Sequence, residues 1–141
     1  MERRKLLSLV CGSAILYSGC VTDRSKNVGL SKVGVINTMD EEIQAEIKII
    51  KNNGDEKLKE IVNFSPNGIK EYTRDWMGTP ASYTASVETA DRYKQTITTE
   101  NIGKNNEQWG DDTCADIIFS IEQKGVLVFI RGVNCSEYKD K

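Results

Sequence analysis

The stretch IQAEIKIIK (residues 43–51) is the segment that decides the fold. Its apolar residues fall at every second position, with polar residues between them, which is the period of a strand with one buried and one solvated face. The Glu, Gln, Ala and Lys content of residues 40–51 leaves a helix as the alternative. A period of two, however, would spread the apolar side chains around a helix. We therefore predict a strand.

Similar short segments lie on both sides of this strand, separated by turn residues such as Asn52-Asn53-Gly54 and Pro66-Asn67-Gly68. Short strands at a regular spacing of about 8–12 residues are typical of a sandwich. The fold class predicted is all-β, an immunoglobulin-like antiparallel β-sandwich of about seven to eight strands. The predicted strands are residues 33–37, 43–51, 57–64, 69–74, 83–87, 93–99, 115–123 and 126–132, and residues 101–112 are predicted to form the longest loop.

The last two strands form an apolar hairpin whose register we predict from its turn. A two-residue turn at Lys124-Gly125 places Cys114 directly opposite Cys135. At a non-hydrogen-bonded position the two Cα atoms would lie about 4.5 Å apart, which suits a disulfide. A three-residue turn with Gly125 in a bulge would shift the pairing by one residue. The predicted register gathers one core face: Ile117, Phe119, Ile121, Val126, Val128 and Ile130.

A disulfide between Cys114 and Cys135 is also what the cysteine content predicts for an exported protein. The alternative is a pair of metal ligands. Zinc sites normally need four nitrogen or sulfur ligands, and the chain has no histidine. We therefore favour the disulfide over a metal site.

The N-terminus has the pattern of a secretory signal. Arg3, Arg4 and Lys5 precede an apolar run over residues 6–17, followed by Ser18-Gly19-Cys20. The run is shorter than the roughly 20 residues that a membrane-spanning helix needs, so a removed signal is favoured. Small residues before Cys20 resemble a lipobox, which predicts a lipid at Cys20, and the twin arginines resemble the signal for export in the folded state. Plain secretion and the general secretory route are the alternatives.

These patterns divide the chain into a signal peptide (residues 1–19), a polar tether (residues 20–29) and a sandwich domain (residues 30–138). The net charge of −2 disfavours nucleic acid, whose binding depends on an excess of Lys and Arg. Without histidine, most acid–base and triad mechanisms near neutral pH have no proton carrier. We therefore expect no catalytic residues and no cofactor.

Two loop tryptophans, Trp76 and Trp109, are the candidate ligand contacts. Exposed aromatic rings stack on sugars, although such rings more often cap the ends of a sandwich core. A cluster of Asp111, Asp112 and Asp116 could hold calcium, but its spacing matches no calcium loop. Two glycosylation sequons begin at Asn63 and Asn134.

Several of these segments together carry a resemblance to a known group. They are Arg3-Arg4-Lys5-Leu6-Leu7, Ser18-Gly19-Cys20, residues 33–37 and 43–51, Trp76 before Tyr83-Thr84-Ala85-Ser86-Val87, and Cys114-Ala115-Asp116-Ile117. The chain resembles the exported lipoproteins of halophilic archaea, many of which carry small immunoglobulin-like domains. The resemblance implies a non-catalytic domain on the outer face of the cell membrane, anchored through lipid at Cys20, which contacts an unknown protein or envelope partner. A small-ligand or glycan-binding module that uses the loop aromatics is the alternative function.

Overall fold

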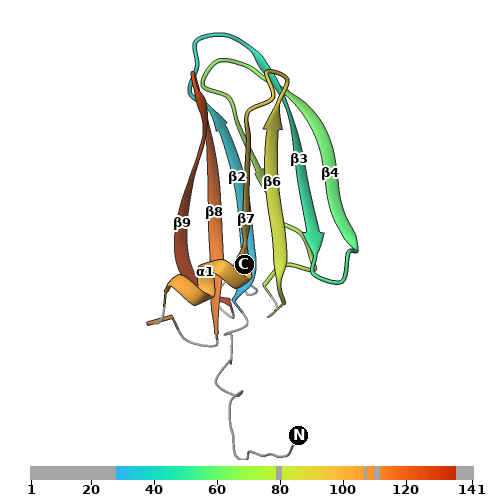
Figure 1. The fold of residues 1–141 in the computed structure, drawn as a ribbon, viewed down its shortest axis with the longest axis vertical. Coiled ribbons are helices and arrows are strands. Elements are labelled where there is room, and N and C mark those ends of the chain that lie inside the picture. The colour runs from blue at the N-terminus through green and yellow to red at the C-terminus, as the bar shows by residue number, and fades with distance from the viewer. Residues whose placement is uncertain (1–27, 79–80, 107, 110–111, 136–141) are drawn as a thin grey trace, which may run out of the picture.

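A computed structural model describes residues 28–78, 81–106, 108–109 and 112–135, which form two four-stranded sheets packed face to face (Figure 1). One sheet has the order β5-β2-β8-β9 and the other the order β4-β3-β6-β7. The all-β sandwich predicted from the sequence is confirmed. The elements are β2 Gly29–Asn37, β3 Ile43–Lys51, β4 Glu56–Phe64, β5 Ile69–Tyr72, β6 Tyr83–Thr89, β7 Lys94–Thr98, α1 Thr99–Asn105, β8 Thr113–Glu122 and β9 Gly125–Asn134.

The segment at residues 43–51 forms β3, an inner strand of its sheet. Ile43, Ala45, Ile47 and Ile49 are buried as their spacing predicted. The β3–β4 turn also follows the sequence, because Gly54 has a positive φ of 88° and its N–H donates to the carbonyl of Lys51 over 2.8 Å. Sequence period and turn chemistry therefore agree in this half of the molecule.

Strand order is where the fold departs from a simple meander. The first strand of the described residues, β2, lies inside its sheet and pairs parallel with β8, while all other pairings of the described strands are antiparallel. The layers are those of immunoglobulin-like sandwiches, although the order differs from that of the immunoglobulin constant domain, in which the first, second, fourth and fifth strands share a sheet. β2 begins at Gly29, and Val28 before it is already buried.

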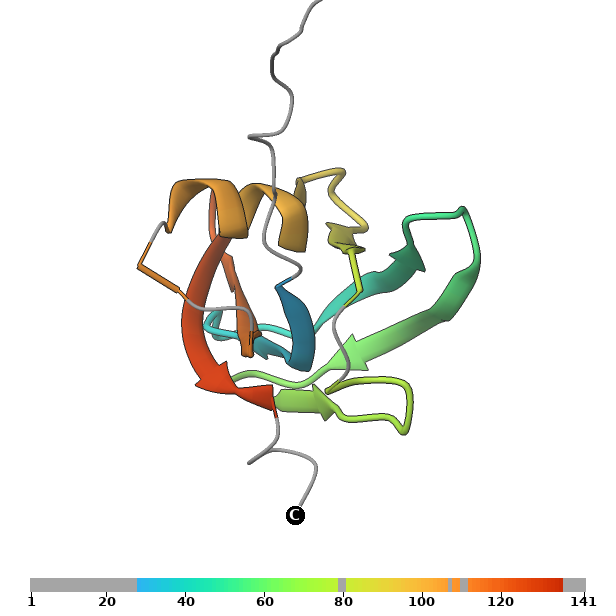
Figure 2. The same ribbon diagram turned by 90° about the horizontal axis from the view of Figure 1, so that it is seen from below.

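The core fills the space between the sheets and is closed at one end by α1. Figure 2 shows α1 lying across this end of the sandwich, where it contacts β6 and β7. The helix begins after Thr98, whose hydroxyl accepts from the N–H of Asn101 at 3.1 Å, and it buries Ile102. The prediction of a continuous loop over residues 101–112 is therefore wrong. Thr98 and Glu100 are an N-cap and a first-turn acid, which are helix-start signals that the sequence carried.

Both described ends of the chain lie at the α1 end of the molecule. β2 and β8 are parallel and start there, and β9 returns there from its turn with β8 (Figure 1). The turns at residues 38–42, 65–68, 90–93 and 123–124 lie at the other end. A tether that precedes Val28 would thus enter at the α1 end.

Candidate contact surface

Apolar side chains gather on the outer face of the sheet β5-β2-β8-β9. Register places residues in rows across this face, and one row contains Ile69, Ile36, Ser120 and Leu127. The next row contains Glu71, Gly34, Ile118 and Phe129. We name the five large apolar residues of these two rows the outer apolar patch: Ile36, Ile69, Ile118, Leu127 and Phe129.

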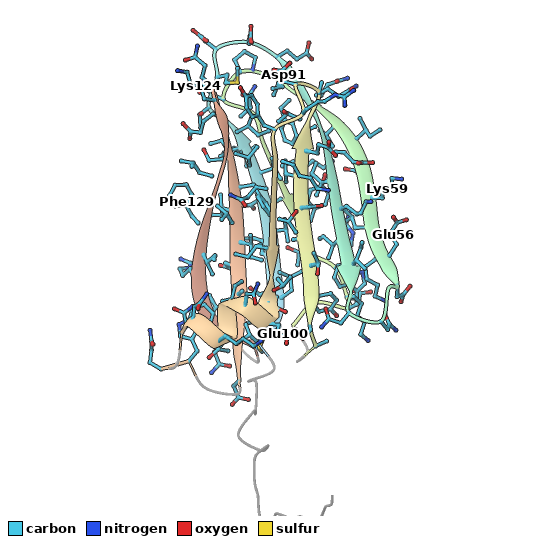
Figure 3. The ribbon with its side chains drawn as sticks, in the orientation of Figure 1. Glu56, Lys59, Asp91, Glu100, Lys124 and Phe129 are labelled. Carbon is cyan, nitrogen blue, oxygen red and sulfur yellow. A yellow bond between two sulfur atoms is a disulfide. The ribbon has the colours of Figure 1, made fainter. Side chains whose placement is uncertain are left out.

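Four members of the outer apolar patch are substantially exposed. The exposed fractions are 64% for Ile69, 57% for Phe129, 51% for Leu127 and 38% for Ile118. Figure 3 shows Phe129 projecting from β9 away from the sandwich. Single exposed apolar residues are ordinary on protein surfaces, whereas a contiguous group is typical of an interaction site.

The patch follows from the apolar run Val126–Ile130 in an edge strand. Alternate residues of a strand point to opposite faces, so Val126 and Val128 turn toward the core and Leu127 and Phe129 turn outward. The unbroken apolar run is the sequence signal that identifies this surface. The predicted core face includes only Val126, Val128 and Ile130 from this run, so the outward-facing Leu127 and Phe129 were not predicted as contact residues.

The register predicted for this hairpin is wrong by two residues. Glu122 pairs with Gly125, so the turn is Gln123-Lys124, and Cys114 lies opposite Val133 instead of Cys135. Gly125 opens β9 with a positive φ of 156°, and neither turn residue has a positive φ. A shift of two keeps each residue on its predicted face, and Val126 is buried as predicted, but Ile130 at the open edge is 37% exposed.

An ionic row borders the patch on the side of the α1 end. The Arg131 guanidinium lies 2.8 Å from the buried carboxylate of Asp116, which also accepts a hydrogen bond from Ser31. Lys32 pairs with Glu71 over 3.4 Å. A shallow hollow of about 280 Å³ is lined here by Lys32, Asp116 and Arg131 together with Ile118, Phe129 and Ile130. The surface is thus mainly apolar in two rows, which also contain Ser120 and Glu71, and ionic in the third.

The structure places both tryptophans against the body of the domain. The ring centroids of Trp76 and Tyr83 lie 5.5 Å apart. Lys57 Nζ lies 5.9 Å from the centroid of the Trp76 ring. Trp109 packs over Gly132, where an added Cβ would come within 2.9 Å of two indole carbons. Both rings are half-buried against the core. Their packing contributes to the end of the sandwich, as aromatic rings commonly do.

Trp109 also borders a hollow of about 360 Å³. Polar side chains surround the indole there, namely Gln108, Asp112, Thr113 and Asn134. Trp109 therefore adjoins a space, within the described part of the chain, that could receive a ligand.

The predicted pairing of Cys114 with Cys135 is present as a disulfide, with Cα atoms 5.0 Å apart. Cys135 lies one residue beyond β9, and its N–H donates to the carbonyl of Asp112 over 2.8 Å. This turn of the chain brings Cys135 back to Cys114, which compensates for the register shift. The disulfide therefore joins the start of β8 to the residue that follows β9, and it does not join directly opposed residues of the two strands.

Other predicted site residues divide between the described and undescribed parts of the chain. Arg3, Arg4, Cys20 and Asp111 lie outside the described residues. Asp116 is engaged by Arg131 and Ser31, and no group of three or more Cys, Asp or Glu within the described ranges is arranged to hold a metal ion. In the same ranges, no helix is long and apolar enough to cross a membrane.

Asn63 and Asn134, which begin the sequons, are both exposed on edge strands. The Asn63 side chain accepts a hydrogen bond from Gln44 over 3.3 Å.

Comparison with known proteins gives no relative: no family model, curated protein or solved structure matches the chain.

Proposed function

We propose that this protein is a non-catalytic contact domain, anchored through lipid at Cys20 to the outer face of the cell membrane, that binds a protein partner through its outer apolar patch. The observation that carries the proposal is the patch itself, which exposes four large apolar side chains on one face of the sheet β5-β2-β8-β9. Exposed, contiguous apolar surface of this kind is a recognised mark of protein contact. The signal-like N-terminus and the disulfide support an oxidising, extracytoplasmic location.

The geometry suits such a tether. The chain enters the sandwich at Val28, at the end where α1 lies (Figure 1). The seven residues between Cys20 and Val28 can span at most about 25 Å when fully extended. A lipid at Cys20 would therefore hold the α1 end toward the membrane. The outer apolar patch lies on a side of the domain, so it would face along the membrane surface toward neighbouring molecules.

The shifted pKa values of Tyr72 and Glu60 need no catalytic explanation. Burial raises the pKa of Tyr72, and a hydrogen bond from Tyr72 lowers the pKa of Glu60. Each group is the cause of part of the other's shift, across 2.6 Å between Tyr72 Oη and Glu60 Oε1. Structural pairs perturb pKa values in this way as well as active sites do.

The anchor is tested by Cys20→Ser, with Cys11→Ser as the matched control because Cys11 lies inside the predicted signal. We expect Cys20→Ser to move the protein out of the washed membrane fraction, while Cys11→Ser leaves it there. The intact mass of the membrane form should show a lipid on a chain that begins at Cys20. A chain that begins elsewhere without added lipid would disprove the anchor. Replacing Arg3 and Arg4 by lysine should block export if the folded-state route is used.

The contact surface is tested by Phe129→Glu, with Ile61→Glu as the control. Ile61 is 63% exposed on β4, in the opposite sheet, so both changes place a carboxylate at an exposed apolar site. We expect cross-linking in whole envelopes to join wild type and Ile61→Glu to a protein partner and to fail for Phe129→Glu. Equal cross-linking of all three proteins would contradict the role of the patch.

Glycan binding is the second candidate, and the hollow beside Trp109 is the observation that favours it. An indole next to amide and carboxylate groups offers both a stacking face and hydrogen bonds for a sugar. If the site is used, oligosaccharides should change the tryptophan fluorescence of wild type and Trp76→Phe but not that of Trp109→Phe. A response that depends on Trp76 alone would contradict this site.

A further inference from the structure

We propose that the partner contributes an extended segment of its own chain, which pairs with the free edge of β9 and adds a strand to the sheet β5-β2-β8-β9. Leu127 and Phe129 of the outer apolar patch lie on β9, so the added segment would widen the patch by one strand. The inference rests on the proposed function, because it concerns the same partner and the same side of the domain.

Two hydrogen bonds show which residues of β9 direct their backbone groups toward the open edge. In an antiparallel ladder every second residue bonds to the neighbouring strand, and the residues between direct their N–H and C=O groups away from it. The N–H of Cys135 bonds to the carbonyl of Asp112 on the continuation of the β8–β9 register, so odd-numbered positions bond toward β8. The carbonyl of Val126 accepts from the side-chain amide of Gln95 over 3.1 Å, so even-numbered positions face the edge.

The edge-facing backbone groups of Val128 and Ile130 are available to a partner. Within the described part of the chain, no strand pairs with the outer side of β9, and no hydrogen bond reaches these N–H and C=O groups. A row of unpaired donors and acceptors on an edge strand is a template for pairing with another extended chain. The backbone chemistry of the edge therefore specifies a strand as its occupant.

The side chains of β9 indicate which residues this strand would carry. Val126, Val128 and Ile130 share the core-facing side of β9, yet the exposed fraction rises from 7% at Val126 to 37% at Ile130. Because the sheet ends at β9, Ile130 stays exposed on the side that should be covered. An added strand would set one side chain beside Ile130 and another beside Phe129 on the outer face. Apolar, β-branched residues fit both positions.

The other three outer strands of the described sheets carry features that protect a sheet edge from pairing. Four of the nine residues of β4 are Glu or Lys. β5 has only four residues, two of them charged, and β7 has five residues and begins with Lys94. β9 has ten residues, of which Arg131 alone is charged, and it contains no proline. Short length and edge charges, above all lysine, are common protection against pairing, so β9 is the edge left open.

The open stretch of β9 is short, which favours a single segment over a second copy of this chain. At the turn end, Gln95 of β7 bonds to the carbonyl of Val126. At the α1 end, Trp109 packs against Gly132, where an added Cβ would come within 2.9 Å of the indole. Residues 127–131 lie between these contacts. One extended chain fits along them, whereas the β9 edge of a second copy would bring its own β7 and its own Trp109 alongside.

Peptide binding to the purified full-length protein tests the pairing. The probe is a short fluorescent peptide of alternating valine and threonine with a lysine at each end. In an antiparallel pair, directly opposed residues share a face and exchange both hydrogen bonds. Valines beside Val128 and Ile130 therefore donate to β9, while the threonine N–H groups point away. We expect N-methylation of the valines to weaken binding by about tenfold or more, and N-methylation of the threonines to change it by less than about twofold.

Ile130→Pro is the corresponding change in the protein, and Ile61→Pro is its matched control. Proline at residue 130 removes an edge-facing N–H that takes no part in the ladder with β8, so an edge strand tolerates it. The N–H of Ala90 bonds to Gln44, so the even-numbered residues of β3 bond to β6. Ile61 lies opposite Glu46 and therefore also directs its N–H to an open edge. We expect Ile130→Pro to weaken peptide binding by about tenfold and to lose the cross-link in envelopes, and Ile61→Pro to keep both.

Three results would overturn the proposal. The first is that the unmodified peptide binds wild type no better than its valine-methylated form does, a comparison that requires no variant to fold. The second is full cross-linking of folded Ile130→Pro in envelopes where Phe129→Glu fails, which would leave the proposed function intact. The third is a dimer of the purified protein that Ile130→Pro dissociates, because a second copy would then occupy the edge. If wild type forms no cross-link in envelopes, the proposed function fails separately and the peptide comparison decides the edge.

Discussion

At the scale of single residues, Tyr72 links the two sheets through a group that titrates. Its ring is fully buried in β5, yet its hydroxyl donates to Glu60 on β4 over 2.6 Å. That hydrogen bond is the largest cause of the lowered pKa of Glu60, and Lys70 adds to it from 3.6 Å. The two outer strands β4 and β5 are thereby joined across the edge of the sandwich.

Tyr72→Phe should therefore lower stability in a pH-dependent way. Because the pKa of Glu60 is lower in the folded protein than the ordinary 4.5, the pair stabilises the fold above that value and loses its effect as the pH falls through the folded pKa. Glu60 is partly exposed, so we expect a loss of only about 1 kcal/mol at pH 7. Urea unfolding at pH 7 and at pH 3 measures the difference, which should shrink at the lower pH.

Tyr93→Phe is the control for this measurement, because Tyr93 is 41% exposed. It should leave the free energy of unfolding nearly unchanged at both pH values. An equal loss for Tyr72→Phe at pH 7 and pH 3 would show that the hydroxyl acts without Glu60.

At the scale of elements, the sequence predicts strand positions best where one face of the strand is buried and the other is exposed to solvent. β3 and β6 keep a strict period of two, and their predicted positions are confirmed. α1 was missed because its seven residues bury only one large apolar side chain, Ile102, so no helical period is visible. The N-cap Thr98 and the first-turn Glu100 were the remaining sequence signals for this helix. Hairpin register was missed for a different reason, since either Gln123-Lys124 or Lys124-Gly125 can form a two-residue turn and both keep the same faces.

The disulfide acts on the closing hairpin, and its removal should lower stability without changing the fold. Replacing Cys114 and Cys135 by serine frees a loop of about twenty residues in the unfolded chain, for which the chain-entropy model gives roughly 3 kcal/mol. The cross-strand pairs of β8 and β9 do not depend on the bond. Urea unfolding should therefore show a lower midpoint, and circular dichroism should keep its strand signal.

Reduction of the wild-type protein provides an independent control for the serine variant. Both should unfold at nearly the same urea concentration if the bond alone is responsible. An unchanged midpoint in both would mean that the connection between Cys114 and the end of β9 contributes no stability.

At the scale of the whole molecule, the class of fold is readable from the sequence but the strand order is not. Periodicity reports which face of a strand is buried, and it carries no information on which strand lies beside it. The pairing of β2 with β8 joins residues about eighty positions apart, such as Val33 with Ile117. The outer apolar patch depends on that pairing, because β2 contributes Ile36 and Gly34 to its rows. A patch assembled from distant strands could not be read from any one segment.

The central place of β2 predicts how far the chain can be shortened. Val28 and Leu30 are fully buried, and the carbonyl of Leu30 accepts from the N–H of Gly78 over 2.8 Å. A chain that starts at Asn27 should keep a cooperative unfolding transition, because all of β2 is retained. A chain that starts at Val33 should lose it, since the removed residues pair with β8 and fill the α1 end of the core. Cooperative unfolding of both chains would show that the first residues of β2 are dispensable. Loss of cooperative unfolding in the chain that starts at Asn27 would mean that residues before Asn27 are needed for the fold.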